Sequence, residues 1–109
     1  MAVASVSSGT QTATISTEHS LATSTTGKTY VLSVDLTNMV NGDELELRLY
    51  TKALTGSTKH LAYFATFAHI QTAPNVFSVP VPALFYCEAS LKQTAGTGRN
   101  FDWNLLSLD

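Results

Sequence analysis

The sequence predicts an all-β protein, a single antiparallel β-sandwich or jelly-roll-like domain of seven to eight strands with little or no helix. Several segments alternate apolar and polar residues at a period of two, which is typical of half-buried strands. Turn signals rich in glycine, proline and asparagine separate these segments, as they do in sandwiches and jelly rolls. No segment sustains the longer period of an amphipathic helix.

The chain has 109 residues, which is the length of one domain. We expect an extended N-terminal arm over residues 1–9 and a single β-sandwich domain over residues 10–109. Up to residue 27 the only formally charged side chain is Glu18, and Ser, Thr, Ala and Val dominate. Within this stretch Gln11–Thr17 alternates like an edge strand, because threonine favours extended structure.

Two strict alternations follow, over residues 28–37 and 44–49, and each predicts a half-buried strand. The connection between them contains Asn41-Gly42, a pair that accepts positive φ. We therefore expect a hairpin or an adjacent antiparallel pair. In the second strand the expected core residues are Leu45, Leu47 and Leu49, and the expected solvent-facing residues are Glu44, Glu46 and Arg48.

Residues 61–67 form the most apolar run, with apolar or aromatic side chains on both faces. Such a strand is either central in a sandwich or covered by another subunit. The prolines at 74, 80 and 82 then confine the segment 76–81 to a sheet edge, because proline cannot donate to a ladder of hydrogen bonds.

The last two segments are predicted as a strand pair joined by a glycine-rich turn. Residues 85–92 alternate, and the chain turns through Gly96 and Gly98, which permit a tight backbone. Arg99 is expected to pin this turn to a carboxylate or a carbonyl. The final strand is expected to return to the core with Phe101 and Trp103.

The charge of the chain argues against binding nucleic acid. Charged residues make up 13% of the sequence, against roughly 25% in an average globular domain. The formal net charge is -2, and the six basic residues are spread thinly, so the positive field that attracts phosphates is missing. Because there is no basic N-terminal region before an apolar run and no run of 18 apolar residues, we expect neither a signal peptide nor a membrane span.

The sequence holds no recognisable motif for catalysis, cofactor binding or metal binding, so we expect no catalytic residue, no cofactor, no metal site and a protein that is not an enzyme. His19, His60 and His69 lie far apart and lack ligand spacing. Cys87 is the only cysteine and falls on an apolar face. A small buried hydrophobe is favoured there over a nucleophile or an intermolecular bridge.

Two weaker alternatives remain open in this sequence. Glu44 and Glu46 have the i, i+2 spacing of two carboxylates on one strand face, which suits a glycosidase pair or, with Asp43, a calcium ion. An exposed face paired with Arg48 is the favoured interpretation. Tyr63 and Tyr86 would serve a carbohydrate-binding module if both lay on a solvent-facing surface.

The closing segment LKQTAGTGRNFDWNLLSL, together with STEHSLATSTTGKTYVLSVDLTNMVNGDELELRLYTKAL upstream, resembles small structural proteins of tailed bacteriophages. In these proteins a short β domain is followed by a QTAGTGRxFxW ending. The resemblance extends from about Ile15 to the end of the chain and contains no catalytic motif.

The resemblance implies a virion protein assembled in the host cytoplasm, and most specifically a capsid decoration or cement protein. Its expected partners are the major capsid protein and further copies of itself, with a homotrimer favoured. No contact with nucleic acid or membrane is expected. The alternatives are another phage structural role, as a coat, tail or fibre component, and the carbohydrate-binding module described above.

Overall fold

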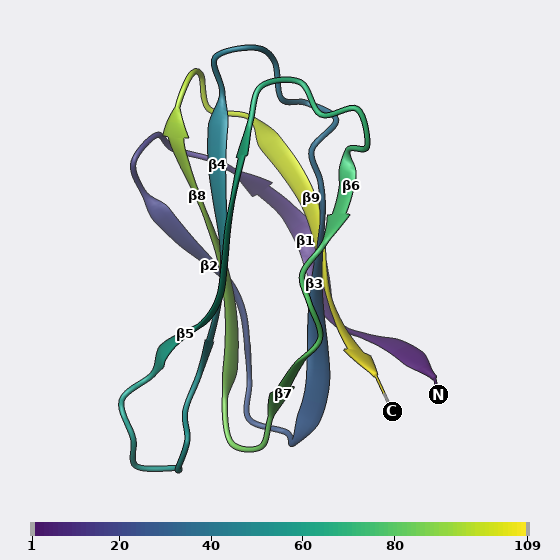
Figure 1. Ribbon diagram of the computed structural model, residues 1–109, viewed down its shortest axis with the longest axis vertical. Helices are drawn as coiled ribbons and strands as arrows, with labels where there is room; N and C mark the ends of the chain where they lie inside the picture. Colours follow the sequence, from purple (N-terminus) through teal and green to yellow (C-terminus); the bar gives the residue numbers. More distant parts are fainter. Residues whose placement is uncertain (1, 109) are drawn as a thin grey trace.

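The computed structural model describes residues 2–108, which form two antiparallel sheets packed face to face (Figure 1). One sheet has the strand order β1-β9-β3-β6, with β7 also paired to β3, and the other has the order β2-β8-β4-β5. No helix occurs in residues 2–108, so the prediction of an all-β sandwich is confirmed. The strands are β1 (Val3–Thr12), β2 (Glu18–Ser24), β3 (Lys28–Asp35), β4 (Glu44–Thr51), β5 (His60–Ala68), β6 (Asn75–Phe77), β7 (Val81–Ala83), β8 (Cys87–Ala95) and β9 (Asn100–Leu108).

The topology is that of a jelly roll. Strands β6 and β7 both pair with β3 and act as two halves of one interrupted strand, so nine strands fill eight positions. The two sheet orders are those of a sandwich built from two Greek keys. Only the β4–β5 connection is a hairpin within one sheet, and every other connection between consecutive positions crosses the sandwich.

The two strand pairs predicted as sequential neighbours are therefore not neighbours. Strand β3 lies in the five-stranded sheet and β4 in the four-stranded sheet, and β9 and β8 are separated in the same way (Figure 1). The β3–β4 connection carries Leu36 and Met39, both buried in the core. Their burial draws the connection across the end of the sandwich, because apolar side chains gain free energy by leaving water.

The segment expected to be an N-terminal arm is largely strand β1, paired along its length with β9. The strand ends at Thr12, so the predicted strand Gln11–Thr17 is wrong over most of its length. The chain leaves the sheet at Ala13, which is buried, and turns at Ser16, whose φ is 67°. Met1 and Asp109 lie outside the described residues. Hydroxyl groups on β1 bond side chains of β9 in three pairs: Ser5 with Asn104, Thr10 with Asp102, and Thr12 with Asn100.

The core between the sheets is built from the inward residues of the alternating strands. Leu45, Leu47 and Leu49 of β4 are buried, as is Phe101 of β9. Trp103 is partly buried and packs against the core from one side of the sandwich. Gly9 on β1 lies over this indole, and a Cβ there would meet the ring in ordinary van der Waals contact at 3.5 Å.

Strand β5 lies at an edge of the four-stranded sheet and pairs only with β4, so a central position in the sandwich is ruled out for it. Its inward side chains, which face the core beside the leucines of β4, are Tyr63, Ala65 and Phe67. Phe64 points to the outer face and is 49% exposed. Coverage by another subunit, the second alternative for this strand, stays a prediction.

Candidate functional site

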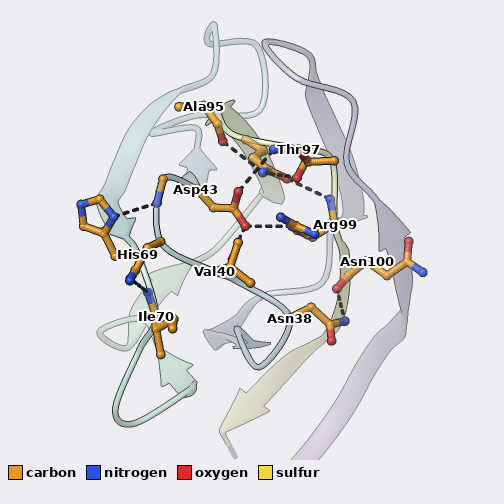
Figure 2. A network of polar contacts seen from close by, with 12 residues as sticks. Asn38, Val40, Asp43, His69, Ile70, Ala95, Thr97, Arg99 and Asn100 are labelled. Carbon is orange, nitrogen blue, oxygen red and sulfur yellow. Dashed lines mark hydrogen bonds and ion pairs between the residues drawn. The ribbon is translucent and has the colours of Figure 1, made fainter.

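The densest polar cluster among the described residues centres on Asp43, at the start of β4 (Figure 2). The residue is 1% exposed. One carboxylate oxygen, Oδ2, accepts hydrogen bonds from the Val40 amide at 3.0 Å and from Nε of Arg99 at 2.9 Å. The other, Oδ1, accepts from the Thr97 amide at 3.3 Å. Asp43 therefore ties the β3–β4 connection to the β8–β9 connection at one end of the sandwich.

The charge of Asp43 is stabilised by these donors. Burial by itself would raise the pKa of the carboxyl group, because a charge loses hydration in the interior. The hydrogen bonds from Val40, Arg99 and Thr97, with the positive charge of Arg99, outweigh burial and hold the pKa below its ordinary value of 3.8. The carboxylate is thus ionised at neutral pH and serves as a fixed acceptor.

Gln93, on β8, completes the same turn from the inside. Its side chain is fully buried, and its amide donates to the carbonyls of Ala95 and Thr97 at 3.1 and 2.7 Å. Its Oε1 accepts from the Arg99 amide at 3.1 Å. A buried polar group costs free energy unless it is bonded, and here the backbone of the turn supplies the partners.

The glycines of the turn are required by the close approach of other chain segments. Gly96 has φ of 91°, and a Cβ there would lie 2.0 Å from Oδ1 of Asp43. At Gly98 a Cβ would lie 2.2 Å from the carbonyl oxygen of Ala13. This turn joins two sheets rather than two strands of one sheet, so the prediction that it joins a pair of neighbouring strands is wrong.

Two of the three histidines accept hydrogen bonds from loop amides. Nδ1 of His69 accepts from Gly42 at 2.9 Å, and the His69 amide donates to the carbonyl of Asp43 at 2.8 Å (Figure 2). Nε2 of His19 accepts from Thr14 at 3.0 Å, in a different loop. Between residues 2 and 108, no three His, Cys, Asp or Glu side chains gather at metal-binding distance.

A second polar network covers the outer face of the four-stranded sheet. Glu18 of β2 accepts hydrogen bonds from Arg48 at 3.0 Å, from Tyr50 at 2.7 Å and from Ser90 at 2.6 Å. Burial alone would raise the pKa of Glu18, but these bonds and the charge of Arg48 lower it. Arg48 also bonds Glu46 at 2.6 Å. The network joins β2, β8 and β4 across the sheet.

Glu88 of β8 anchors the other half of this outer face. It is 7% exposed although its alternation places it away from the core, because Lys59 and Tyr86 cover it at 2.6 and 2.7 Å. Burial opposes ionisation of Glu88, and the bonds from Lys59 and Tyr86 outweigh it and lower the pKa of the carboxyl group. Glu18 therefore links three strands, while Glu88 ties the β4–β5 connection, through Lys59, to β8.

The aromatic rings of this face are covered by cations. Lys52 lies 4.5 Å from the centroid of Tyr86, Lys59 lies 4.8 Å from that of Tyr50, and the guanidinium of Arg48 lies 5.4 Å from that of Phe64. Cations favour the negative face of an aromatic ring. The two tyrosines considered as a sugar platform do not share a surface, because Tyr63 faces the core and Tyr86 the outside.

The carboxylate pair considered from the sequence lies on this outer face as well. Glu44 and Glu46 flank the inward Leu45, but Glu46 is engaged by Arg48 while Glu44 is exposed. Asp43 points the other way, into the Arg99 turn. The three carboxylates therefore do not converge on one point.

Cys87 is fully buried on the inner face of β8. Burial first, and then the charge of Glu88, raise the pKa of its thiol to about 11. A thiol with this pKa is almost entirely protonated at neutral pH, and only the thiolate is nucleophilic. The structure places Cys87 in the core cluster as a small apolar side chain.

Sequence reasoning missed the two side chains that organise the turn, Asp43 and Gln93. A signal for both exists, because Asp43 shares the inward parity of Leu45 and Gln93 shares that of Leu91. A polar residue at an inward position of an alternating strand is costly unless it is bonded. Such a residue therefore marks a structural anchor.

The carboxylates with lowered pKa predict how stability depends on pH. The pKa values of Asp43, Glu18 and Glu88 are lower in the folded protein than their ordinary values of 3.8, 4.5 and 4.5. Their contribution to stability is thus complete above these ordinary values and is lost as the pH falls through the lower folded values. We expect the free energy of unfolding, measured by urea titration, to be nearly constant from pH 7 to about pH 5 and to fall steeply below about pH 4.

The variant Glu18→Gln is the control for this loss of stability at low pH, which we call the acid limb. It removes one titrating group from the outer network, so its stability should depend less steeply on pH below about 4 than that of the wild type. A wild-type protein equally stable at pH 3 and pH 7 would contradict the assignment of these three carboxylates as stabilising anions.

An apolar stripe runs along the β6–β7 edge, formed by Phe77, Val79, Pro80, Pro82 and Leu84. Phe77, Val79 and Leu84 are 60%, 57% and 68% exposed. Ser78 lies between them and is buried, with its Oγ accepting from the Leu32 amide of β3 at 2.9 Å. Because Ser78 fixes the segment to β3, the stripe is presented on a rigid edge.

An open hollow of about 550 Å³ adjoins the stripe at Pro82 and Leu84. Gly27, Thr29 and Leu108 line its other side. Lys28 lines the hollow as well, so its surface is mixed, and the exposed stripe beside it is the apolar part of this region.

Comparison with known proteins identifies no relative of this chain. No family model matches it, and neither the curated proteins nor the solved structures contain a significant match. The described residues also include no helix of the length and hydrophobicity needed to cross a bilayer.

Proposed function

We propose that this chain is a non-enzymatic structural protein of a virion, a decoration protein that binds the lattice of the major capsid protein and stabilises the shell by contact. The observation that carries the proposal is the apolar stripe. Exposed apolar side chains that gather in one place, as Phe77, Val79 and Leu84 do along the β6–β7 edge, mark interaction sites more often than apolar side chains scattered singly do.

The composition of the surface supports the same function. Only 13% of the residues are charged, so little charge repulsion opposes close packing against a neighbour. The clustered carboxylates that we describe bond cations, hydroxyl groups and backbone amides that hold the fold together. The jelly roll is also an architecture of viral capsid domains, which is an analogy of fold and carries less weight than the stripe.

In this proposal each copy adds a modest apolar contact at the stripe, and many copies on a lattice add up to a large effect. A ligand that binds only the assembled shell stabilises it by mass action. Binding at repeated sites on one particle strengthens the total further through effective concentration. The resemblance of the sequence from about Ile15 to its end to structural proteins of tailed bacteriophages supports a phage capsid as the lattice.

A heat challenge of phage shells tests the proposal. Shells that carry the protein should withstand a higher temperature than shells stripped of it, and adding back the wild type should restore the difference. The double variant Phe77→Ser, Leu84→Ser should fail to restore it, because the exposed apolar contacts are lost. Its own Tm should stay near the wild-type value, since both side chains are exposed.

The matched control is Ile70→Ser, which removes a side chain that is 63% exposed but lies outside the stripe. It should restore shell stability as well as the wild type does. Shells that melt at the same temperature with and without the protein would contradict a decoration role. Equal restoration by the stripe variant and the control would contradict the stripe as the contact surface.

A further inference from the structure

Strand β5 differs from the other sheet edges in having a regular and largely apolar stretch, residues 63–67. The β6–β7 edge consists of two three-residue strands interrupted by Pro80, and β2 starts at Glu18 and carries a bulge in its middle. Short strands, prolines, charges and bulges are the devices that keep sheet edges from pairing. Strand β1 is uncharged, but its outward hydroxyl groups bond β9 and its side chains are polar over residues 7–12.

The free edge of β5 runs without interruption over residues 63–67, which pair in regular register with β4. At its end the Ala68 carbonyl already accepts a hydrogen bond from Nε2 of Gln71 at 2.8 Å. This stretch has no charge and no proline, and its register shift lies before it, at Ala62. Tyr63 and Phe67 are only partly buried although they face the core. The edge therefore leaves both backbone groups and apolar side chains incompletely covered.

We propose that β5 pairs antiparallel with β5 of a second copy about a twofold axis at Ala65, joining the two four-stranded sheets into one sheet of eight strands. This mode of association adds strand to strand at a sheet edge, with the main chain supplying the hydrogen bonds. Isologous contact of one edge with itself closes with two copies.

The inner face fits this register. With Ala65 opposite Ala65, each Tyr63 lies opposite Phe67 of the other copy. Both residues face the core in their own sandwich, so the pairing extends each core row across the junction: Leu49 and Tyr63 of one copy continue into Phe67 and Leu45 of the other. Aromatic pairs directly opposite each other are among the favourable cross-strand contacts.

The outer face of the sheet also fits this register. Phe64 lies opposite Thr66 of the other copy, an aromatic residue against a β-branched one. Behind them on β4, Arg48 neighbours Phe64 and Glu46 neighbours Thr66. Each row across the junction therefore has Arg48 at one end and Glu46 at the other, so no charged side chain lies at the contact itself.

The pairing goes beyond the proposed function and uses a different surface, since the apolar stripe lies on the other sheet. It predicts a dimer, where the sequence resemblance implied a trimer. The shell experiment tests the stripe, and sedimentation and cross-linking test the pairing of β5, so either proposal can fail without the other.

Sedimentation of the full chain over a concentration series tests the pairing. We expect a monomer–dimer equilibrium and, in hydrogen exchange, protection of the Phe64 and Thr66 amides that rises with concentration. These two amides face the free edge, because the His69 amide bonds the Asp43 carbonyl and the alternate residues of β5 therefore bond β4. Thr66→Lys should raise the dimer dissociation constant at least tenfold, because it places a charge on the edge. The new lysine lies beside Glu46 of its own strand neighbour, so the monomer is expected to keep its Tm.

Ser8→Lys is the matched control, because it places the same charge on the exposed edge strand β1 of the other sheet. It should leave the dimer dissociation constant unchanged. A chain that stays monomeric at its highest soluble concentration, or an assembly that Thr66→Lys does not weaken, would overturn the proposal. A stable trimer would also overturn it.

Cross-linking tests the register. Directly opposed Cα atoms in an antiparallel pair lie about 4.5–5.5 Å apart, within the range of a disulfide. Ala65→Cys should therefore form a disulfide-linked dimer under mild oxidation, while the native Cys87 is buried and should not. Leu61→Cys should give no such product, because in this register its two copies are about 26 Å apart. Cross-linking at Leu61 in preference to Ala65 would show that the register is wrong.

Discussion

Replacing Gly96 by alanine is expected to destabilise the protein by about 4 kcal/mol, because two costs fall on one Cβ atom. The φ of 91° is unfavourable for any residue with a side chain. The new Cβ would also lie 2.0 Å from Oδ1 and 2.9 Å from Cα of Asp43, so the carboxylate would be displaced from its donors. The free energy of unfolding from urea titration measures this effect.

Gly42 and Gly98 separate the two costs. Gly42 has φ of 100°, but a Cβ there would meet no atom within 4 Å, so Gly42→Ala should cost about 1–2 kcal/mol from backbone strain alone. Gly98→Ala meets the Ala13 carbonyl at 2.2 Å without a positive φ, and it reports the steric cost alone. If Gly96→Ala cost no more than Gly42→Ala, the close packing of Asp43 against the turn would be contradicted.

The variant Asp43→Ala is expected to lower the free energy of unfolding by about 3 kcal/mol. It leaves the Val40 and Thr97 amides without their acceptor and Arg99 without its counter-ion. Removing one partner of a buried pair costs more than the pair contributes, because the other group stays desolvated. For a domain of this size each kcal/mol lowers Tm by about 4–8 °C, which calorimetry resolves.

The neighbouring carboxylate supplies the control for Asp43. Glu44 is exposed, so Glu44→Ala should change the free energy of unfolding by no more than about 0.5 kcal/mol. The Asp43→Ala protein should also lose part of the acid limb seen in the wild type, since the group responsible is absent. Equal stability of the two variants would show that Asp43 does not anchor the turn.

For the two candidate contact surfaces, the sequence predicts the position of one strand edge and leaves the other undecided. The prolines at 80 and 82 indicate an edge, and β6 and β7 do lie at an edge. The run at residues 61–67 is apolar on both faces, and in the sequence this pattern is the same for a central strand and for an edge strand. Its place at the edge depends on which strands pair with it, and β4 is its only partner.

The contacts that hold the β8–β9 turn could not be predicted from the sequence either. Arg99 was expected to meet a carboxylate or a carbonyl, but nothing local marks Asp43, 56 positions earlier, as its partner. The two meet because both connections cross the same end of the sandwich. Two consecutive strands show the same alternation of apolar and polar residues whether they form a hairpin or lie in opposite sheets. The sequence therefore could not distinguish these arrangements, and the hairpin predictions for β3–β4 and β8–β9 were wrong.

By itself the sequence determined the all-β class and the inward faces of strands such as β4, because a period of two follows from local backbone geometry and from the hydrophobic effect. The tertiary structure alone decided the jelly-roll order, the edge position of β5, the burial of Glu88 on an outer face and the Asp43–Arg99 contact. These features depend on contacts between residues far apart in the chain. Such contacts depend on how the two sheets pack against each other, and the local sequence pattern does not specify that packing.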